Sequence, residues 1–217
     1  MAPTSPLEPA ILFRHPLAAA VVAELAEAGF QAASIDAMIA RAGSSRAEFD
    51  RFFDDKEDAA TRVFEAYAEN FKERAGRAFA AESTWPDNLR AAAYETARWI
   101  LDHPHGTRFG MVSSLEAGER PRLVREGTFR WCAGLIEQGR EVAPNPVAVP
   151  EGAALMAVGA IVEILARTTQ GTLEADTVAM VAPMMYGAVR PYLGEEVARA
   201  ELVIPPPADL LPAGPGS

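Results

Sequence analysis

The sequence has few of the residues from which enzyme active sites and metal centres are built. Its 217 residues include one cysteine, Cys132, and three histidines. One cysteine excludes an intramolecular disulfide and any zinc site of several cysteines, and it fits a reducing compartment. No histidine stands in a metal-ligand spacing, and neither G-x-S-x-G nor a phosphate-binding glycine loop occurs. The sequence therefore predicts no catalytic residues, no metal, no cofactor and no enzyme activity.

Long apolar runs and a basic balance are also missing. The longest apolar candidate, Ala153 to Ala166, is interrupted by Glu163 and falls short of the roughly 18 residues that a membrane span needs. The N-terminus lacks a basic region followed by an apolar core, so no secretory signal is expected. The net charge of −10 argues against a general binder of polyanions or anionic membranes. We expect a cytoplasmic protein with no membrane partner, and the 49% of hydrophobic residues predict a substantial core.

The most informative stretch runs from Ser34 to Glu57. Ser34 stands at an N-cap position before an apolar helical face, and Gly43 supplies the backbone freedom that a helix C-terminus favours. Ser45 starts a second helix, and Glu48 completes an S-x-x-E capping box. Two short helices joined by a turn that contains glycine predict a helix-turn-helix, whose second helix enters the major groove of DNA.

These residues resemble the N-terminal domain of the TetR (tetracycline-repressor) family. The resemblance covers about the first quarter of the chain, and the rest is similar in helical pattern and length. The residues that carry it are Gly29-Phe30, Ser34-Ile35 through Ile39-Ala40, Ala42-Gly43, Ser45, Phe53, Lys56 and Glu57.

The resemblance implies a homodimeric, all-helical repressor whose variable C-terminal domain binds a small ligand and forms the dimer. The recognition helix would run from Ser45 to Phe53, and Lys56 would hold a phosphate at the start of the next helix. The predicted contacts to operator DNA are Ser44, Ser45, Arg46, Ala47, Phe49, Arg51 and Lys56.

The charge of this region supports a second hypothesis. Residues 1–57 hold five basic residues against nine acidic ones, and Asp50 lies within the recognition helix itself. Phosphate neutralisation by Lys and Arg supplies most non-specific affinity for DNA. The alternative is therefore a small-molecule-binding dimer of the same fold that binds DNA weakly or not at all.

The remaining sequence predicts only helices. We expect an all-α protein of about nine helices, with a helix-turn-helix domain at 1–54, a ligand-binding and dimerisation domain at 55–204 and a disordered tail at 205–217. A helix of about 25 residues should begin at Asp55. Two further helices are predicted at 151–170 and 174–193, the second with a kink at Pro183.

Aromatic and methionine side chains from several predicted helices suggest an apolar cavity for a small, largely hydrophobic effector. The alternative, that the aromatics form the core and that Glu163 only pairs with Arg167, stays open. The predicted ligand-binding residues are Tyr67, Phe71, Trp99, Phe109, Met111, Trp131, Met156 and Glu163.

The last two predicted helices are apolar over more of their surface than one core contact can cover. Paired about a two-fold axis with a second copy, they would form a four-helix interface. The predicted residues of this homodimer interface are Ala157, Ala160, Val178, Val181, Met185, Val189 and Tyr192.

Overall fold

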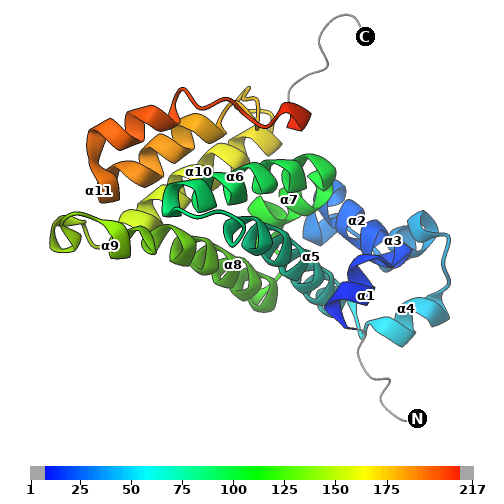
Figure 1. Ribbon diagram of the computed structural model, residues 1–217. Coiled ribbons are helices and arrows are strands. Elements are labelled where there is room, and N and C mark those ends of the chain that lie inside the picture. Colours follow the sequence, from blue (N-terminus) through cyan, green and yellow to red (C-terminus); the bar gives the residue numbers. More distant parts are fainter. Residues whose placement is uncertain (1–7, 211–217) are drawn as a thin grey trace, which may run out of the picture. The chain divides into compact units, whose positions relative to one another are not determined.

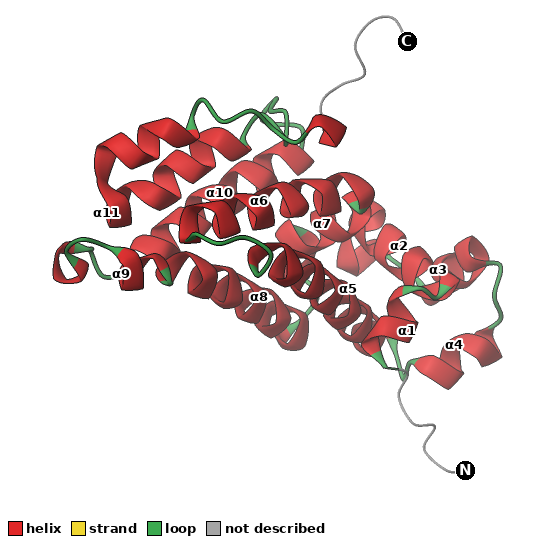
Figure 2. Cartoon of the chain, viewed as in Figure 1, coloured by secondary structure: helices red, strands yellow, loops and turns green. Residues whose placement is uncertain are grey.

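The computed structural model describes residues 8–210 and confirms the all-α prediction: within that range every regular element is a helix (Figures 1 and 2). The helices are α1 (Pro9–Phe13), α2 (Pro16–Ala32), α3 (Ile35–Ala42), α4 (Arg46–Phe52), α5 (Lys56–Phe79), α6 (Trp85–Asp102), α7 (Pro104–Met111), α8 (Glu119–Glu137), α9 (Gly139–Val142), α10 (Ala153–Thr169) and α11 (Val181–Glu201). Three 3-10 turns are η1 (Ser113–Leu115), η2 (Pro146–Ala148) and η3 (Ala208–Leu210). None of the helices is long and apolar enough to cross a membrane within the described range.

The chain packs as two compact units. Within the described residues, unit 1 comprises residues 8–73 and 103–128, and unit 2 comprises residues 74–102 and 129–210. Helices α5 and α8 are each divided between the units: the first part of each helix belongs to unit 1 and the last part to unit 2. Unit 1 therefore contains the predicted helix-turn-helix together with α7 and the first parts of α5 and α8. The predicted domain boundary between residues 54 and 55 separates the helix-turn-helix from the remaining helices, whereas the two units are defined by packing. The predicted domains stay a prediction.

Side-chain caps define the helix-turn-helix in unit 1. The hydroxyl of Ser34 accepts a hydrogen bond from the Ala37 amide at 3.1 Å, and the hydroxyl of Ser45 accepts one from the Glu48 amide at 3.2 Å. Gly43 ends α3 in the left-handed region at φ 61°, which explains the need for glycine there. These contacts confirm the predicted start and end of α3 and the predicted start of α4.

The long helix α5 also follows its prediction closely. It has 24 residues, and Asp55 caps it by accepting a hydrogen bond from the Asp58 amide at 2.8 Å. Its buried face in unit 1 contains Val63 and Phe64, and the ring of Phe64 packs edge to face on the ring of Phe109 of α7 at 5.2 Å. This packing holds α7 in the same unit as the helix-turn-helix.

Unit 2 places α11 differently from its prediction. Helix α10 matches the predicted range, but α11 begins at Val181 rather than 174 and continues to Glu201, across a break at Gly194 where φ is 82°. Pro183 lies in the first turn of α11, where proline is tolerated, so the predicted kink at Pro183 is wrong. The predicted start was too early because apolar residues occur both in the irregular segment before Val181 and on several faces of α11. The sequence pattern therefore does not separate the two.

The predicted dimer residues of α11 lie inside unit 2. Val181, Met185, Val189 and Tyr192 are 3%, 2%, 0% and 3% exposed and belong to the core that α11 forms with α6 and α10. This is a correction, because a side chain already buried within its own chain cannot form an interface between folded copies. Val178 precedes α11 and is half-buried against the same core.

The opposite face of α10 and α11, which run side by side in Figure 1, is exposed. Leu155 and Met156 are 65% and 63% exposed, and Gly159 and Ala160 of α10 and Gly187 of α11 are exposed as well. Of the predicted interface residues, Ala160 belongs to this face and Ala157 is half-buried at its edge. We call the face made of Leu155, Met156, Gly159, Ala160 and Gly187 the small-residue face.

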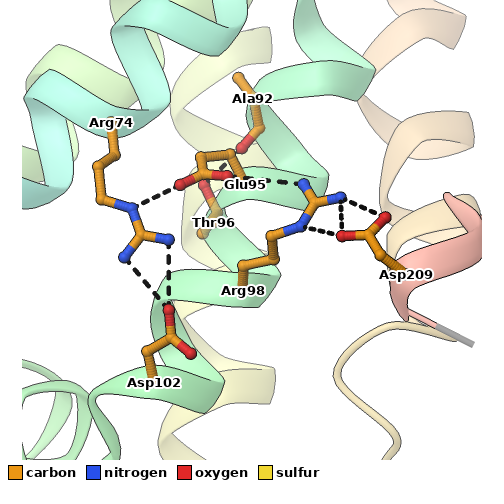
Figure 3. A network of polar contacts seen from close by, with 7 residues as sticks. All are labelled: Arg74, Ala92, Glu95, Thr96, Arg98, Asp102 and Asp209. Carbon is orange, nitrogen blue, oxygen red and sulfur yellow. Dashed lines mark hydrogen bonds and ion pairs between the residues drawn. The ribbon is translucent and has the colours of Figure 1, made fainter. Parts of the chain in front are cut away.

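A polar network joins η3 to α6 in unit 2 (Figure 3). Arg74 donates to Glu95 at 2.5 Å and to Asp102 at 3.3 Å, and Arg98 donates to Asp209 at 2.7 to 2.9 Å. Residues 205–210 were predicted as the start of a disordered tail, but a bidentate ion pair between Arg98 and Asp209 holds this segment against α6. Residues 211–217 lie outside the described residues, as do residues 1–7 at the other end.

Candidate nucleic-acid interface

The second helix of the helix-turn-helix, α4, has one buried face and one exposed face. Its buried face consists of Phe49 and Phe52, which are 0% and 8% exposed. Arg46 and Arg51 lie on the exposed face. The other exposed side chains are Ser45 at the N-cap, Ala47 and Asp50. Small residues beside two guanidinium groups allow close approach to a base edge, which is the geometry that a recognition helix requires.

Phe49 was predicted to contact DNA, and the structure corrects this. Its ring is completely buried and lies 5.2 Å from the ring of Phe53. In a helix of 3.6 residues per turn, positions 49 and 52 share one face, opposite position 47, and the exposed Arg46 reaches over the edge of that face, with its guanidinium 6.0 Å from the centre of the Phe49 ring. Phe49 therefore anchors α4 to the core of unit 1.

Asp50, the acidic residue of α4 that supports the hypothesis of weak DNA binding, forms an ion pair within α4. The Nε of Arg46 donates to Oδ1 of Asp50 at 2.8 Å, and both side chains are about half exposed. The i, i+4 spacing of the two residues was visible in the sequence, and it was the signal that could have identified this pair.

Glu48 is turned away from the exposed face. Its Oε2 accepts a hydrogen bond from the Ser44 hydroxyl at 2.7 Å, and its Oε1 lies 3.8 Å from Nε2 of His15. The Ser45 half of the predicted capping box forms, but the Glu48 carboxylate binds the Ser44 side chain instead of the backbone. Ser44 is half-buried and its hydroxyl is engaged within the protein, which weakens its prediction as a DNA contact.

Lys56 was predicted to hold a phosphate, and in the structure its ammonium group caps another helix. Its Nζ donates to the carbonyls of Phe30 at 2.7 Å and Ala33 at 2.9 Å, and it lies 4.6 Å from the centre of the Phe30 ring. Helix α2 is broken at Gly29, where φ is 76°, and these carbonyls lie in the segment after the break, where charge-assisted hydrogen bonds from the ammonium group stabilise them. Lys56 therefore clamps the end of α2 to the start of α5.

Arg51 and Ala47 remain on the exposed face as predicted contacts. The guanidinium of Arg51 lies 4.8 Å from the centre of the Phe52 ring, an arrangement that orients the side chain without burying its charge. Nothing in the chain alone tests whether these residues touch DNA, so the contacts at Ser45, Arg46, Ala47 and Arg51 stay predictions.

The predicted ligand-binding residues are divided between the two units. Tyr67, Phe71, Phe109 and Met111 belong to unit 1, and Trp99, Trp131, Met156 and Glu163 belong to unit 2. Phe109 and Tyr67 are 1% and 7% exposed, which is the burial of core residues, and Trp99 is 8% exposed. Burial alone does not separate a cavity wall from a packed core.

Two members of that set are exposed, which corrects the prediction. Met156 is 63% exposed on the small-residue face. Glu163 is 61% exposed on its side chain and accepts from Nε of Arg167 at 2.6 Å, so the open alternative of a solvated i, i+4 ion pair holds. A side chain that points to solvent within its own unit does not line a cavity of that unit. A shallow, open hollow on the surface of unit 1 is lined by Leu115, Gly118, Glu119 and Arg122, none of which was predicted to bind a ligand.

Helix α7 is bonded directly to α2 within unit 1. The Nε of Arg108 donates to the carbonyl of Ala26 at 2.8 Å, and Nε2 of His105 lies 3.0 Å from Glu27. Arg41 of α3 donates two hydrogen bonds to the same Glu27 carboxylate, and these bonds lower the pKa of Glu27 below its usual value. Sequence reasoning missed this cluster, because residues 26, 41, 105 and 108 come together only through the fold.

Between residues 8 and 210, no group of three or more histidine, cysteine, aspartate or glutamate side chains is placed to hold a metal ion. What the site offers is α4, a capped helix with an exposed polar face, in a unit where α7 is hydrogen-bonded to α2.

No protein-family model matches the sequence, and a search of curated proteins finds no match. Solved structures do match. The fatty acid degradation regulator FadR from Bacillus halodurans aligns with a TM-score of 0.69 and 15% identity, over 80% of this chain and 96% of that one. FadR from Bacillus subtilis, solved in complex with stearoyl-CoA, aligns with a TM-score of 0.68 and 17% identity, over 81% and 97%. A TetR-like transcriptional regulator from Rhodococcus sp. RHA1 aligns with a TM-score of 0.62 and 18% identity, over 82% and 94%.

These alignments span nearly the whole of each matched regulator and about four fifths of this chain. At this level of identity they establish the architecture. The chain has the fold of the TetR-family transcriptional regulators.

Proposed function

We propose that this protein is a DNA-binding transcriptional regulator, a repressor that a small and largely hydrophobic molecule releases from its operator. The observation that carries the proposal is α4, a side-chain-capped helix whose phenylalanines are buried and whose arginines are exposed. Amphipathic surface helices are common, but this one follows α3 through a glycine-containing turn in the helix-turn-helix arrangement. The shared fold of transcriptional regulators supports the same reading.

The packing of α7 on α2 supports control by a ligand. A ligand acts on DNA binding only if it has different affinities for two arrangements of the protein. Movement of α7 would be transmitted to α2 through the Arg108–Ala26 hydrogen bond and the His105–Glu27 contact. The complex of Bacillus subtilis FadR with stearoyl-CoA makes a long-chain acyl-CoA the first effector to test.

A homodimer is part of the proposal, and the small-residue face is its proposed interface. Monomeric proteins rarely leave large contiguous apolar patches in water. Gly159, Ala160 and Gly187 allow another pair of helices to approach closely, while Leu155 and Met156 supply apolar area. The proposed interface thus keeps the predicted pair of helices, α10 and α11, but uses the face of α11 opposite to the predicted one.

The second candidate function is a small-molecule-binding dimer of this fold with weak or no DNA binding. The excess of acidic over basic residues in residues 1–57 favours it. The Arg46–Asp50 pair leaves that net charge unchanged, because Arg46 is already counted among the basic residues, but the Ser44–Glu48 hydrogen bond turns one acidic group away from the exposed face of α4.

A gel shift on DNA from directly upstream of the protein's own coding sequence, at low salt, tests the proposal. We expect a retarded complex whose affinity falls steeply with salt. Arg46→Ala should weaken it strongly, whereas Arg122→Ala, which removes an exposed charge of unit 1 from α8, should change it little. Stearoyl-CoA should release the DNA. Absence of any complex at low salt, with stearoyl-CoA still bound by the protein, would instead establish the second candidate.

A further inference from the structure

Arg46 and Asp50 stand where a recognition helix reads base edges. Arg46 is the first residue of α4 and Asp50 lies one turn further on, on the same exposed face. The N-terminal residues of recognition helices are the ones that contact bases. A solvent-exposed ion pair at i, i+4 contributes little to helix stability, so stabilisation of α4 is a weak reason for this arrangement.

The hydrogen bond leaves the end of the arginine side chain available. The Nε of Arg46 donates to Oδ1 of Asp50 at 2.8 Å, and among the described residues Asp50 is the one polar partner of Arg46. The side chain of Arg46 is 59% exposed. Its Nη1 and Nη2 groups therefore keep the parallel donor pair that binds O6 and N7 of guanine.

We propose that Asp50 is a positioning residue that fixes the guanidinium of Arg46 for end-on recognition of a guanine in the major groove. This inference rests on the proposed function, since it names what the exposed face of α4 reads. Holding the guanidinium at Nε restricts its rotation, so less freedom is lost when both Nη groups bind the base.

The negative charge of Asp50 has a second consequence. A carboxylate near the DNA repels phosphates and lowers affinity for every sequence alike. The carboxylate weakens the guanine contact of Arg46 less than it weakens binding to phosphates, because the guanine contact uses Nη1 and Nη2, and Asp50 binds Nε. Asp50 thus lowers non-specific binding while it raises discrimination, and the acidic character of α4 becomes a determinant of specificity.

The test selects bound sequences from duplexes with a randomised central region, using the full-length protein and its variants. Asp50→Ala removes the positioning carboxylate. Asp54→Ala is the matched control, since Asp54 is also an exposed acidic residue, just beyond α4, whereas the carboxylate bound by Arg46 is that of Asp50. Arg46→Ala identifies the base that Arg46 reads. Competition with a duplex in which that guanine is replaced measures the discrimination ratio for each variant.

We expect wild type to enrich a guanine at one position of each half-site, and Arg46→Ala to lose that preference. Asp50→Ala should lower the discrimination ratio by about tenfold, within the range that one bidentate base contact provides, while its affinity for random duplexes rises. Asp54→Ala should raise random-duplex affinity similarly and keep the ratio.

Two results would overturn the inference. If Asp50→Ala retains the discrimination of wild type, or if Asp54→Ala loses as much, then Asp50 does not position Arg46, and the proposed function still stands. If wild type enriches no sequence at all, the proposed function fails together with the inference.

Discussion

Helices α4 and α11 differ in how firmly the sequence determines them. Helix α4 has seven residues and is started by a side-chain cap at Ser45, and its buried and exposed residues separate onto two faces. Helix α11 has 21 residues, no side-chain cap at its start, and apolar residues on both its core face and its solvent face. The first helix is defined by local chemistry, whereas the second depends on which face the rest of unit 2 covers.

The strongest test of this difference uses two positions of α11 that are two residues apart. Val189 is completely buried, and Gly187 is exposed with nothing within 4 Å of where a Cβ would lie. Val189→Glu places an unpaired charge in the core of unit 2 and should abolish its folding, since such a charge costs several kcal/mol. Gly187→Glu should keep the fold and disrupt self-association.

Circular dichroism and light scattering together distinguish the two outcomes. A folded monomer for Gly187→Glu would support the small-residue face as the dimer interface. A folded monomer for Val189→Glu would restore the face predicted from the sequence.

The matching test in α4 is Phe49→Ala. The ring of Phe49 is fully buried, so its removal should cost about 3–5 kcal/mol, as for other buried phenylalanines. Ala47→Ser, on the exposed face, should leave stability nearly unchanged. Denaturant unfolding measures both variants, and a loss below 1 kcal/mol for Phe49→Ala would mean that Phe49 is not part of the core.

Lys56 sharpens the comparison within unit 1, because sequence and structure give it different roles. Lys56→Ala removes hydrogen bonds from a charged donor to the Phe30 and Ala33 carbonyls and should destabilise the protein by about 1–3 kcal/mol. A phosphate contact predicts a different result, namely unchanged stability and a shallower salt dependence of DNA binding. Thermal unfolding of the free protein separates the two roles.

The smallest expected effect concerns η3 in unit 2. Hydrogen bonds from Arg98 lower the pKa of Asp209. A carboxyl group whose pKa is depressed by folding stabilises the fold above its unfolded pKa of about 3.9, and that contribution is lost as the pH falls through the depressed value. An NMR titration should therefore find Asp209 below the usual range, and Arg98→Ala should return it there. An unshifted Asp209 in wild type would contradict the ion pair in Figure 3.

The residues themselves show how much of the molecule was predictable. Ser34, Gly43 and Ser45 act through backbone groups at most four positions away, so the sequence alone identifies the helix-turn-helix. Phe49 was assigned to the wrong role although its helical position was right, because the choice between core and DNA depends on what covers the face.

Contacts between distant segments were beyond sequence reasoning. Lys56 meets the carbonyls of residues 30 and 33, Arg108 meets that of Ala26, and Arg98 meets Asp209. None of these spacings is periodic. Which face of α11 packs in its own core could not be predicted for a related reason. The alanines, glycines, valines and methionines of α11 are equally compatible with a core and with an interface between copies.

The most direct test of DNA reading by α4 is hydroxyl-radical footprinting of the wild-type protein on the DNA upstream of its own coding sequence. A dimer that presents two copies of α4 should protect two backbone segments about 34–36 Å apart, one helical turn along a single face of the duplex. At the protein concentration that protects the wild-type footprint, Arg46→Ala should weaken both protected segments together while the protein stays folded and dimeric. A footprint that is identical in wild type and Arg46→Ala, or a folded wild-type dimer that protects no segment at low salt, would contradict recognition by α4.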